Sequence, residues 1–331
     1  MQKTTIASHY VRTLLLSLKR ANIDYQEHLR HAGISEAVLD DERARIPYES
    51  YVTLTRSAWK ALGDENLNLT ETPLKLGAFR YTGMLMLHTP TLRHALKLGM
   101  DFHRYINPGY EISLTEESNG ALIEVSLHSP ALDENHLFAE FILSGWHRFS
   151  SWLIDRNIVL KHVSFDFPSP PHEAEYQYIF PCPRDFNQDS LSIRFGAHYL
   201  DQPIVKSDDD FAHYTQQTPA GLLIVPADDD SYSAKIRRQL DACTDCRFPS
   251  FDEVARTLHM TPKTLRQKLK KEGIIYQEIK DVIRRDSAIH YLTLYRMPVA
   301  DIALRVGFTE TGAFIRAFKG WTGVTPGAYR H

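Results

Sequence analysis

Two stretches near the end of the chain decide its fold: FDEVARTLHMTPKTLRQKLKKEG, residues 251–273, and VADIALRVGFTETGAFIRAFKGWTGVTPGAYR, residues 299–330. In both stretches a short run of apolar residues at helical spacing is followed by a polar turn and a longer run with the same period. Each stretch therefore predicts a short helix, a tight turn and a longer helix.

The two stretches repeat one pattern, and we call them the first copy (residues 250–272) and the second copy (residues 298–320). The longer helices of the two copies are separated in the sequence by one residue more than the short helices are. The second copy therefore has one extra residue early in its longer helix. An internal repeat indicates a repeated structural unit. The matched positions are Val254 with Ile302, Ala255 with Ala303, Met260 with Phe308, Thr261 with Thr309, Leu265 with Phe314 and Leu269 with Phe318.

Residues suited to helix ends support these boundaries in the first copy. Ser250 and Glu253 have the spacing of a capping box, in which each side chain bonds the backbone N–H of the other residue. Thr261 followed by Pro262 suits the cap and the first position of the longer helix.

The turn between the two helices of each copy requires a residue with positive φ. Gly307 supplies it in the second copy, and His259 takes the same place in the first copy. Histidine is tolerable there because it enters the left-handed region more readily than most residues. Thr309 is expected to cap the longer helix of the second copy.

Charge is divided unequally along the chain. Residues 231–331 contain 18 Lys and Arg against 10 Asp and Glu, a net charge of +8, whereas residues 1–230 carry a net charge of −11. A basic C-terminal third on an acidic body suggests that a module for binding a polyanion is joined to a domain that does not bind one.

Length and composition indicate a soluble protein of two domains. The 331 residues suffice for two cores, and the apolar content of 43% and charged content of 24% are ordinary for globular proteins. No secretory signal opens the chain, and no run approaches the ~18 apolar residues of a membrane span. Three cysteines are too few for a disulfide framework, so we expect a cytoplasmic location and no membrane partner.

The N-terminal two thirds mix helical and strand periodicities, which predicts an α+β domain that ends near Pro203. Two acidic triplets follow, residues 208–210 and 228–230, and both suit the starts of helices. The main predicted elements are helices over 11–29, 48–62, 76–87, 91–106 and 137–153, a hairpin of 110–114 with 121–127, strands over 159–167 and 191–195, and a short helix over 174–180.

These patterns predict the domain organisation and the fold class. Residues 1–205 form an α+β effector-binding and dimerisation domain, and residues 206–230 form a linker region. Residues 231–331 form an all-α domain of two helix-turn-helix units, about 250–272 and 298–320, joined by a linker helix.

The two copies resemble the DNA-binding domain of the AraC/XylS family. The terminal Gly-Phe…Phe-x-Arg-x-Phe-Lys-x-Trp-x-Gly-x-x-Pro run is the most specific part of this resemblance. The N-terminal part is similar to the "arabinose-binding" effector domain of ornithine-utilisation and virulence regulators. That similarity rests on HAGISEAVLDDERARIPYES, HTPTLRHALKL and the Phe-x-x-Pro-x-Pro…Tyr-x-x-x-Phe pattern of residues 165–180.

The longer helix of the first copy has the two faces that a recognition helix needs. In KTLRQKLKK, Leu265 and Leu269 face inward and leave basic and polar side chains outward. Arg and Gln pair with base edges, while Lys mostly neutralises phosphates. The linker pattern over residues 276–295 would span roughly 30 Å, close to the ~34 Å between successive major-groove faces.

The resemblance implies base contacts by Lys263, Arg266 and Gln267 in the first copy and by five residues of the second. Gly312 and Ile315 bond bases poorly, so we expect the second copy to contribute more to affinity than to sequence choice. The full set of candidate DNA-binding residues is Lys263, Thr264, Arg266, Gln267, Lys270, Lys271, Glu310, Thr311, Gly312, Ile315, Arg316 and Lys319.

An effector site is expected in the N-terminal domain, where polar and aromatic groups interrupt an apolar region. The candidates to line it are Arg80, Tyr81, His103 and Tyr105, although packing or surface roles explain each of them as well. The sequence does not identify the effector. Cys243 and Cys246 have C-x-x-C spacing, but no second pair completes a zinc site, so we expect no metal and no cofactor.

The sequence therefore predicts a DNA-binding transcription regulator, an activator that responds to a small molecule and binds promoter DNA. The resemblance implies a homodimer, with the helix over 137–153 as the candidate interface, although core packing explains its apolar face equally well. One alternative is a constitutive regulator whose large domain only dimerises. The other, an enzyme with a DNA-binding tail, lacks the nucleophile elbow or four-cysteine zinc site it would need, so no catalytic residue is expected.

Overall fold

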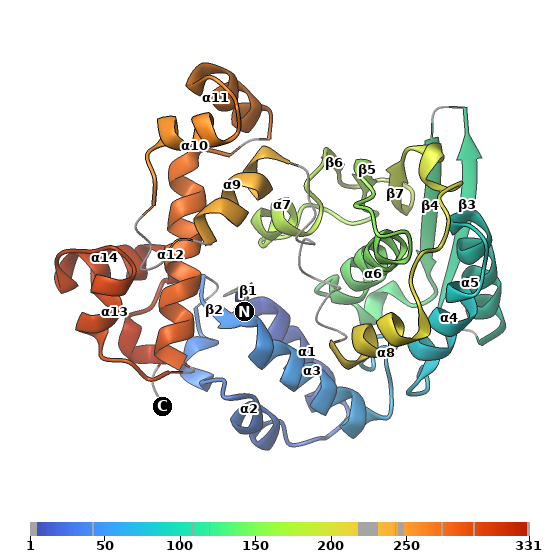
Figure 1. Ribbon diagram of the computed structural model, residues 1–331. Coiled ribbons are helices and arrows are strands. Elements are labelled where there is room, and N and C mark those ends of the chain that lie inside the picture. Colours follow the sequence, from blue (N-terminus) through green and yellow to red (C-terminus); the bar gives the residue numbers. More distant parts are fainter. Residues whose placement is uncertain are drawn as a thin grey trace. The chain divides into compact units, whose positions relative to one another are not determined.

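The computed structural model describes residues 5–41, 43–106, 109–118, 120–217, 231–241, 243, 248–272, 274–293 and 295–329 (Figure 1). The chain divides into two compact units. The helical unit comprises Met1–Arg12, Gln26–Leu54 and Ala227–His331, and the sheet unit comprises Thr13–Tyr25 and Thr55–Pro226. The first and last parts of the chain thus share one unit, whereas the functional boundaries expected at residues 205 and 231 stay a prediction.

The sheet unit is built on a five-stranded sheet with the strand order β3-β4-β7-β5-β6. All neighbouring pairs are antiparallel except β5 with β6. The predicted hairpin is confirmed, and it is longer than predicted because Tyr110 pairs with Leu127 and Glu117 with Gly120. The strands are β3 (Tyr110–Glu117), β4 (Gly120–Leu127), β5 (Leu160–Ser164), β6 (Arg184–Asp185) and β7 (Leu191–Phe195).

Helices of the sheet unit fall within the stretches predicted as helical, except the last, which begins at the first acidic triplet of the expected linker region. They are α4 (Ala78–Leu87), α5 (Leu92–Ile106), α6 (Leu137–Leu153), α7 (Tyr176–Ile179) and α8 (Asp208–Gln217). The acidic triplet at residues 208–210 starts α8 as expected, and the Asp210 carboxylate accepts from the Ser207 backbone N–H at 2.9 Å. The second triplet, residues 228–230, lies outside the described residues.

Helix α6 is the central helix of the sheet unit. Most of its side chains are buried, and it contacts α5 and β7. Its start is held by Asp133, whose two carboxylate oxygens each accept a backbone N–H, from Phe138 and from Ala139. Because this burial leaves little of α6 for a partner chain, core packing rather than a dimer interface accounts for its apolar face.

The helical unit begins with a two-stranded antiparallel sheet, in which Ile6 of β1 (Thr5–Ala7) pairs with Ile46 of β2 (Arg45–Pro47). The single helix predicted over residues 11–29 is two helices, and Asn22 between them has a φ of 56°. The division between the units falls inside α1 and α3. The N-terminal helices are α1 (Ser8–Arg20), α2 (Gln26–Ala32) and α3 (Tyr48–Leu62).

The C-terminal part of the helical unit consists of helices, which confirms the predicted fold class of an α+β region followed by an all-α region. They are α9 (Tyr232–Asp241), α10 (Phe251–Thr257), α11 (Pro262–Lys271), α12 (Tyr276–Thr293), α13 (Val299–Arg305), α14 (Thr311–Thr322) and the 3₁₀ helix η7 (Pro326–Tyr329). Across the described residues, no helix combines the length and the apolar character needed to cross a bilayer.

Candidate functional site

The first copy forms α10 and α11, and its ends are fixed as the sequence predicts. Ser250 and Glu253 make a complete capping box at α10. The Thr261 hydroxyl accepts the backbone N–H of Thr264 at the start of α11. His259 takes a φ of 55° in the turn between the two helices. The predicted helix-turn-helix geometry of this copy is therefore confirmed.

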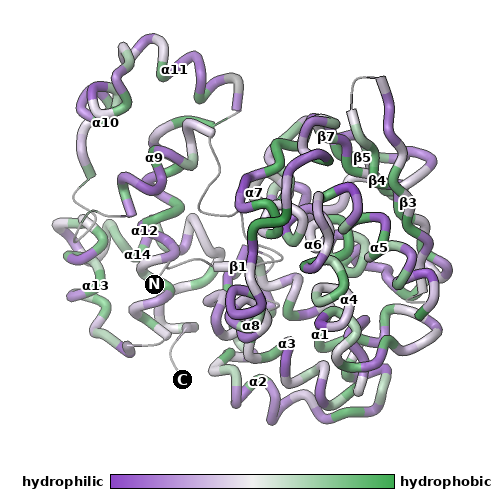
Figure 2. Tube along the Cα trace, turned by 45° about the vertical axis from the view of Figure 1, so that its right-hand side comes forward, coloured by the Kyte–Doolittle hydropathy of each residue, from purple (hydrophilic) through white to green (hydrophobic). Residues whose placement is uncertain are grey.

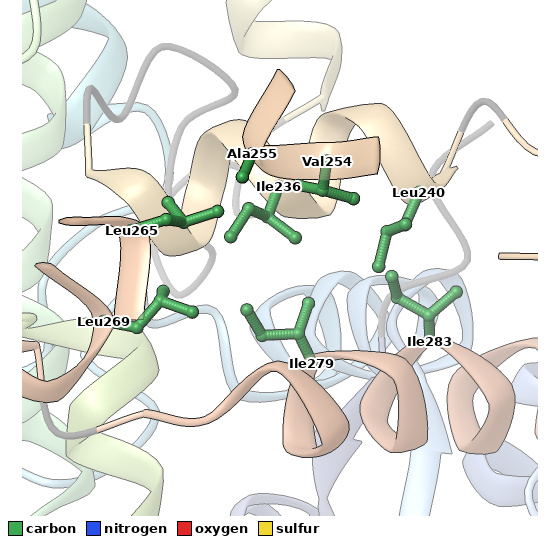
Figure 3. Packing of buried hydrophobic residues seen from close by; sticks show 8 residues of the cluster. All are labelled: Ile236, Leu240, Val254, Ala255, Leu265, Leu269, Ile279 and Ile283. Carbon is green, nitrogen blue, oxygen red and sulfur yellow. The ribbon is translucent and has the colours of Figure 1, made fainter. Parts of the chain in front are cut away.

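A small apolar core holds α11 in place (Figure 3). Leu265 and Leu269 of α11 are buried against Ala255 of α10, together with residues of α9 and α12. Alanine at this position lets the two helices approach closely. The buried cluster comprises Ile236, Leu240, Val254, Ala255, Leu265, Leu269, Ile279 and Ile283.

The opposite face of α11 carries the polar side chains that the sequence nominates. Figure 2 shows this helix as mostly hydrophilic. The Arg266 guanidinium lies 5.3 Å from the ring centroid of Phe251, which orients it without neutralising its charge. Thr264 is half-buried and bonds the Thr261 hydroxyl, and the side chain of Lys271 lies outside the described residues. The exposed candidates are Lys263, Arg266, Gln267 and Lys270.

The second copy forms α13 and α14 around an aromatic core. Phe314 and Phe318 are fully buried, as their match to the leucines of the first copy predicts. Gly307 takes the predicted positive φ, 83°. The cap predicted at Thr309 is wrong, because α14 begins two residues later with Glu310 at its N-cap and no side-chain cap bond. The extra residue of this copy lies in that segment.

The outward face of α14 differs in chemistry from that of α11. Thr311 is half-buried, whereas Glu310, Gly312, Arg316 and Lys319 are exposed. Ile315, with 37% exposure, is an exposed apolar side chain at a position where a hydrogen-bonding residue would read a base. The structure thus places every described candidate of both copies at least partly at the surface.

Helix α12 joins the two copies and has 18 residues, which corresponds to about 27 Å. Arg284 of this helix contacts two aromatic rings, one near each copy. Its guanidinium lies 5.4 Å from the ring centroid of Phe248 and 5.7 Å from that of Phe308. Phe248 precedes the first copy and Phe308 lies in the turn of the second. These contacts help to fix the distance between the two copies.

Sequence reasoning missed that the N-terminal segment is part of this unit. The Thr5 hydroxyl donates to Asp286 of α12 at 2.6 Å, and the backbone N–H of Arg45 donates to the Tyr329 hydroxyl at 2.9 Å. Asp286 is buried and also accepts from Arg237 and Arg285. The available signal was an aspartate on the inward face of an amphipathic helix, since a buried carboxylate requires partners.

Gly323 belongs to the same contact region. It ends α14 with a φ of 77°, a conformation that favours glycine. A side chain here would also collide with the carboxylate of Asp41. The glycine of the predicted Trp-x-Gly motif therefore serves both the helix end and the close approach of the N-terminal segment.

The four residues nominated for an effector site do not lie together. His103 is buried and lines a cavity of the sheet unit. Arg80, Tyr81 and Tyr105 are exposed, Tyr105 by 85%, and none of them lines that cavity. A role for them in effector binding stays a prediction. Cys243 is a free cysteine, and Cys246 lies outside the described residues.

Comparisons with known proteins match both parts of the chain to known families. Residues 23–204 match the family described as the arabinose-binding domain of AraC transcription regulators, N-terminal, and residues 254–331 match a helix-turn-helix domain. The chain is 26% identical over 322 residues to the ornithine utilization regulator of Pseudomonas aeruginosa, covering 97% of this chain and 95% of that protein. It is 35% identical over 79 residues to the urease operon transcriptional activator of Escherichia coli, covering 24% and 27%. The crystal structure of the transcriptional regulator CdpR from P. aeruginosa aligns with 96% of both chains at 20% identity and a TM-score of 0.35.

Proposed function

We propose that this chain, which belongs to the AraC family of transcription regulators, binds promoter DNA sequence-specifically through α11 and α14 and activates transcription in response to a small molecule. The observation that carries the proposal is the pair of helices with a polar outward face, α11 and α14, held on one linker helix.

The spacing of the two copies supports binding by a single chain to one face of the duplex. Successive major-groove faces lie ~34 Å apart, and α12 accounts for about 27 Å before the turns at its ends are added. We infer that α11 and α14 enter adjacent major-groove segments. The contacts of Arg284 with Phe248 and Phe308 hold that spacing.

We propose that the two recognition helices have different tasks. Arg266 and Gln267 of α11 suit bidentate contacts with guanine and adenine, and Lys263 and Lys270 suit phosphates. In α14, Gly312 and Ile315 offer the bases almost no hydrogen bonding. The first copy then sets most of the sequence preference, and the second adds affinity.

The effector response, activation and dimerisation are further parts of the proposal. The names of two relatives, an ornithine utilization regulator and a urease operon activator, support regulation of a metabolic operon by activation. A dimer would join two pairs of recognition helices and raise the effective concentration of the second pair. We propose a role in the cytoplasm, where promoter DNA is found, and no catalytic activity. The alternative is a constitutive regulator whose sheet unit only dimerises.

The test is fluorescence anisotropy of the full chain with labelled duplexes selected from a random pool. We expect binding with a marked preference for the selected sequence and an affinity that falls steeply as salt rises. Arg266→Ala is expected to relax the preference at one base pair, while Arg156→Ala, at an exposed arginine of the sheet unit, serves as the matched control. Equal affinity for all duplexes, or no binding, would refute the proposal.

A further inference from the structure

The sheet unit contains a cavity that the DNA-binding role does not use. It lies between α4, α5, β3 and α6 and has a volume of about 80 Å³. A single water molecule needs about 10–15 Å³ of such space, so the cavity accepts roughly five to eight non-hydrogen atoms. That is the size of a small organic molecule or of one end of a larger one.

The wall of the cavity is largely aromatic. Trp59, Phe79, Trp146 and Phe149 contribute their rings to it. Aromatic faces stack on rings and attract cations, so they accept an apolar ring and also an amine. They give no favourable interaction to an anion.

The charge of the wall also excludes anions. Among the described residues that line the cavity, none is Lys or Arg, and the ionisable carboxyl group is that of Glu65. Its two oxygens accept the backbone N–H groups of Gly77 and Phe79, and burial raises its pKa. A carboxylate or phosphate ligand would be buried here without a counter-ion, which is costly.

On one side of the wall, polar side chains form a series of hydrogen bonds that runs in one direction. Thr82 donates its hydroxyl hydrogen to the Ala78 carbonyl at 2.9 Å, so it must accept from His103 Nε2, 3.1 Å away. Burial lowers the pKa of His103 to about 4, so the ring is neutral. Nδ1 is then an acceptor, and Tyr110 donates to it at 2.7 Å. The Tyr110 oxygen in turn accepts from Trp146 Nε1 at 3.4 Å.

In this series of hydrogen bonds every donor hydrogen is already used, whereas lone pairs of hydroxyl oxygens remain as acceptors. A hydroxyl oxygen has two lone pairs, so Thr82 and Tyr110 each keep one after the bonds described above. A ligand that brings a donor can therefore bond Thr82 or Tyr110, whereas a ligand that brings only an acceptor finds no free donor hydrogen along this series of groups.

We propose that the cavity binds a small apolar molecule that ends in a hydrogen-bond donor, a hydroxyl or amino group, and carries no anionic group. This inference rests on the proposed function, because it names the chemical class of the effector. A free α-amino acid does not fit the class, since its carboxylate would be unpaired in this cavity.

Four probes of matched size test the class on the full chain by ligand-detected NMR titration. Benzyl alcohol and benzylammonium carry donors, anisole is the isomer of benzyl alcohol without a donor, and benzoate is the anion. We expect one of the donor probes to bind about three- to tenfold more tightly than anisole, and benzoate to bind more weakly still. The tighter donor probe shows whether a hydroxyl or an amine is recognised. Anisole or benzoate binding as tightly as both donor probes, or no binding by either donor probe, would overturn the proposal.

Two nearly isosteric variants locate the interaction. Tyr110→Phe and Thr82→Val each remove one acceptor oxygen. In at least one of these variants, we expect the affinity of the tighter donor probe to exceed that of anisole by less than about twofold. Tyr295→Phe is the matched control, because Tyr295 is 63% exposed and does not line the cavity. Thermal unfolding of each variant confirms that it folds. If both cavity variants fold and keep the full advantage, the assignment of this wall is wrong.

DNA affinity, measured with and without probe, separates this inference from the proposed function. If a donor probe binds but leaves DNA affinity unchanged, the proposed effector response is wrong and the proposed ligand class stands. If DNA affinity responds equally to anisole and to benzyl alcohol, the proposed effector response stands and the proposed ligand class is wrong.

Discussion

The two helix-turn-helix copies have the same order of helices and turn, but their cores contain different side chains. The first copy packs aliphatic side chains around Leu265 and Leu269, whereas the second packs the aromatic rings of Phe314 and Phe318. The first is capped by side chains and presents several donors on α11. The second starts α14 without a side-chain cap. The second copy therefore has an aromatic core and a longer helix without a side-chain cap, and the first copy has an aliphatic core and capped helices.

Removing one ring from the second copy should have the largest effect. Phe318→Ala empties a fully buried site next to Tyr329, and we expect it to lower the free energy of unfolding by about 3–5 kcal/mol. Leu269→Ala, the matched change in the first copy, should cost about 2–5 kcal/mol. Hydrogen exchange of the full chain should show each variant opening its own copy first. Equal acceleration in both copies would mean that they unfold as one unit.

Asp286 tests whether the N-terminal segment supports both copies through α12. Asp286→Ala removes the partner of Thr5, Arg237 and Arg285. Breaking a buried charge pair lowers the free energy of unfolding by about 3–5 kcal/mol. We expect a loss of about 2 kcal/mol here, because Arg237 stays about one third exposed.

Chemical denaturation would give this difference, with the exposed Asp301→Ala as control. We expect faster hydrogen exchange in β1 and in α12. An unchanged exchange rate in β1 would contradict a supporting role for the N-terminal segment.

The arginines of the two recognition helices provide the sharpest functional comparison. Arg266→Ala should cost about 1–3 kcal/mol of DNA binding and relax the preference at one base pair. Arg316→Ala should weaken all duplexes alike, as should Lys270→Ala, and each should reduce the salt slope by about 1. Binding-site selection with each variant separates the effects. A variant of Arg316 that alters base preference would show that α14 also reads sequence.

The helix caps give the smallest predicted difference. Thr261→Ala removes the cap of α11 and should cost about 1 kcal/mol of stability. Thr309→Ala should cost almost nothing, since Thr309 does not cap α14. Thermal unfolding of the pair measures this directly. Equal losses for both threonines would indicate that Thr309 acts as a cap in solution.

Local patterns explain why so much of the helical unit was predictable. The family resemblance, the two copies, the positive φ of His259 and the buried positions of both longer helices are confirmed. Each of these depends on residues close together in the sequence. The cap at Thr309 was wrong because the extra residue of the second copy moved the helix start, and a repeat pattern alone does not place an insertion.

Long-range contacts explain what the sequence did not reveal. The bond between Thr5 and Asp286 joins residues 281 positions apart, and no periodicity reports such a pairing. The cavity has the same origin, since Trp59, Thr82, His103 and Tyr110 come from different elements. Of the effector candidates, His103 lines it because its helix face turns inward, while Tyr105, two residues later, faces outward.

The docking of β1 and β2 against α12 and η7 has a consequence for synthesis on the ribosome. Thr5 emerges first, but its partner Asp286 follows 281 residues later. At bacterial-type elongation rates of about 5–20 residues per second, this strand waits roughly 15–55 s for its partner. A nascent chain that stops before residue 286 therefore carries β1 without this partner, and it also lacks α13 and α14. An incomplete product of that length cannot form the helical unit, which needs both the N-terminal segment and the C-terminal helices.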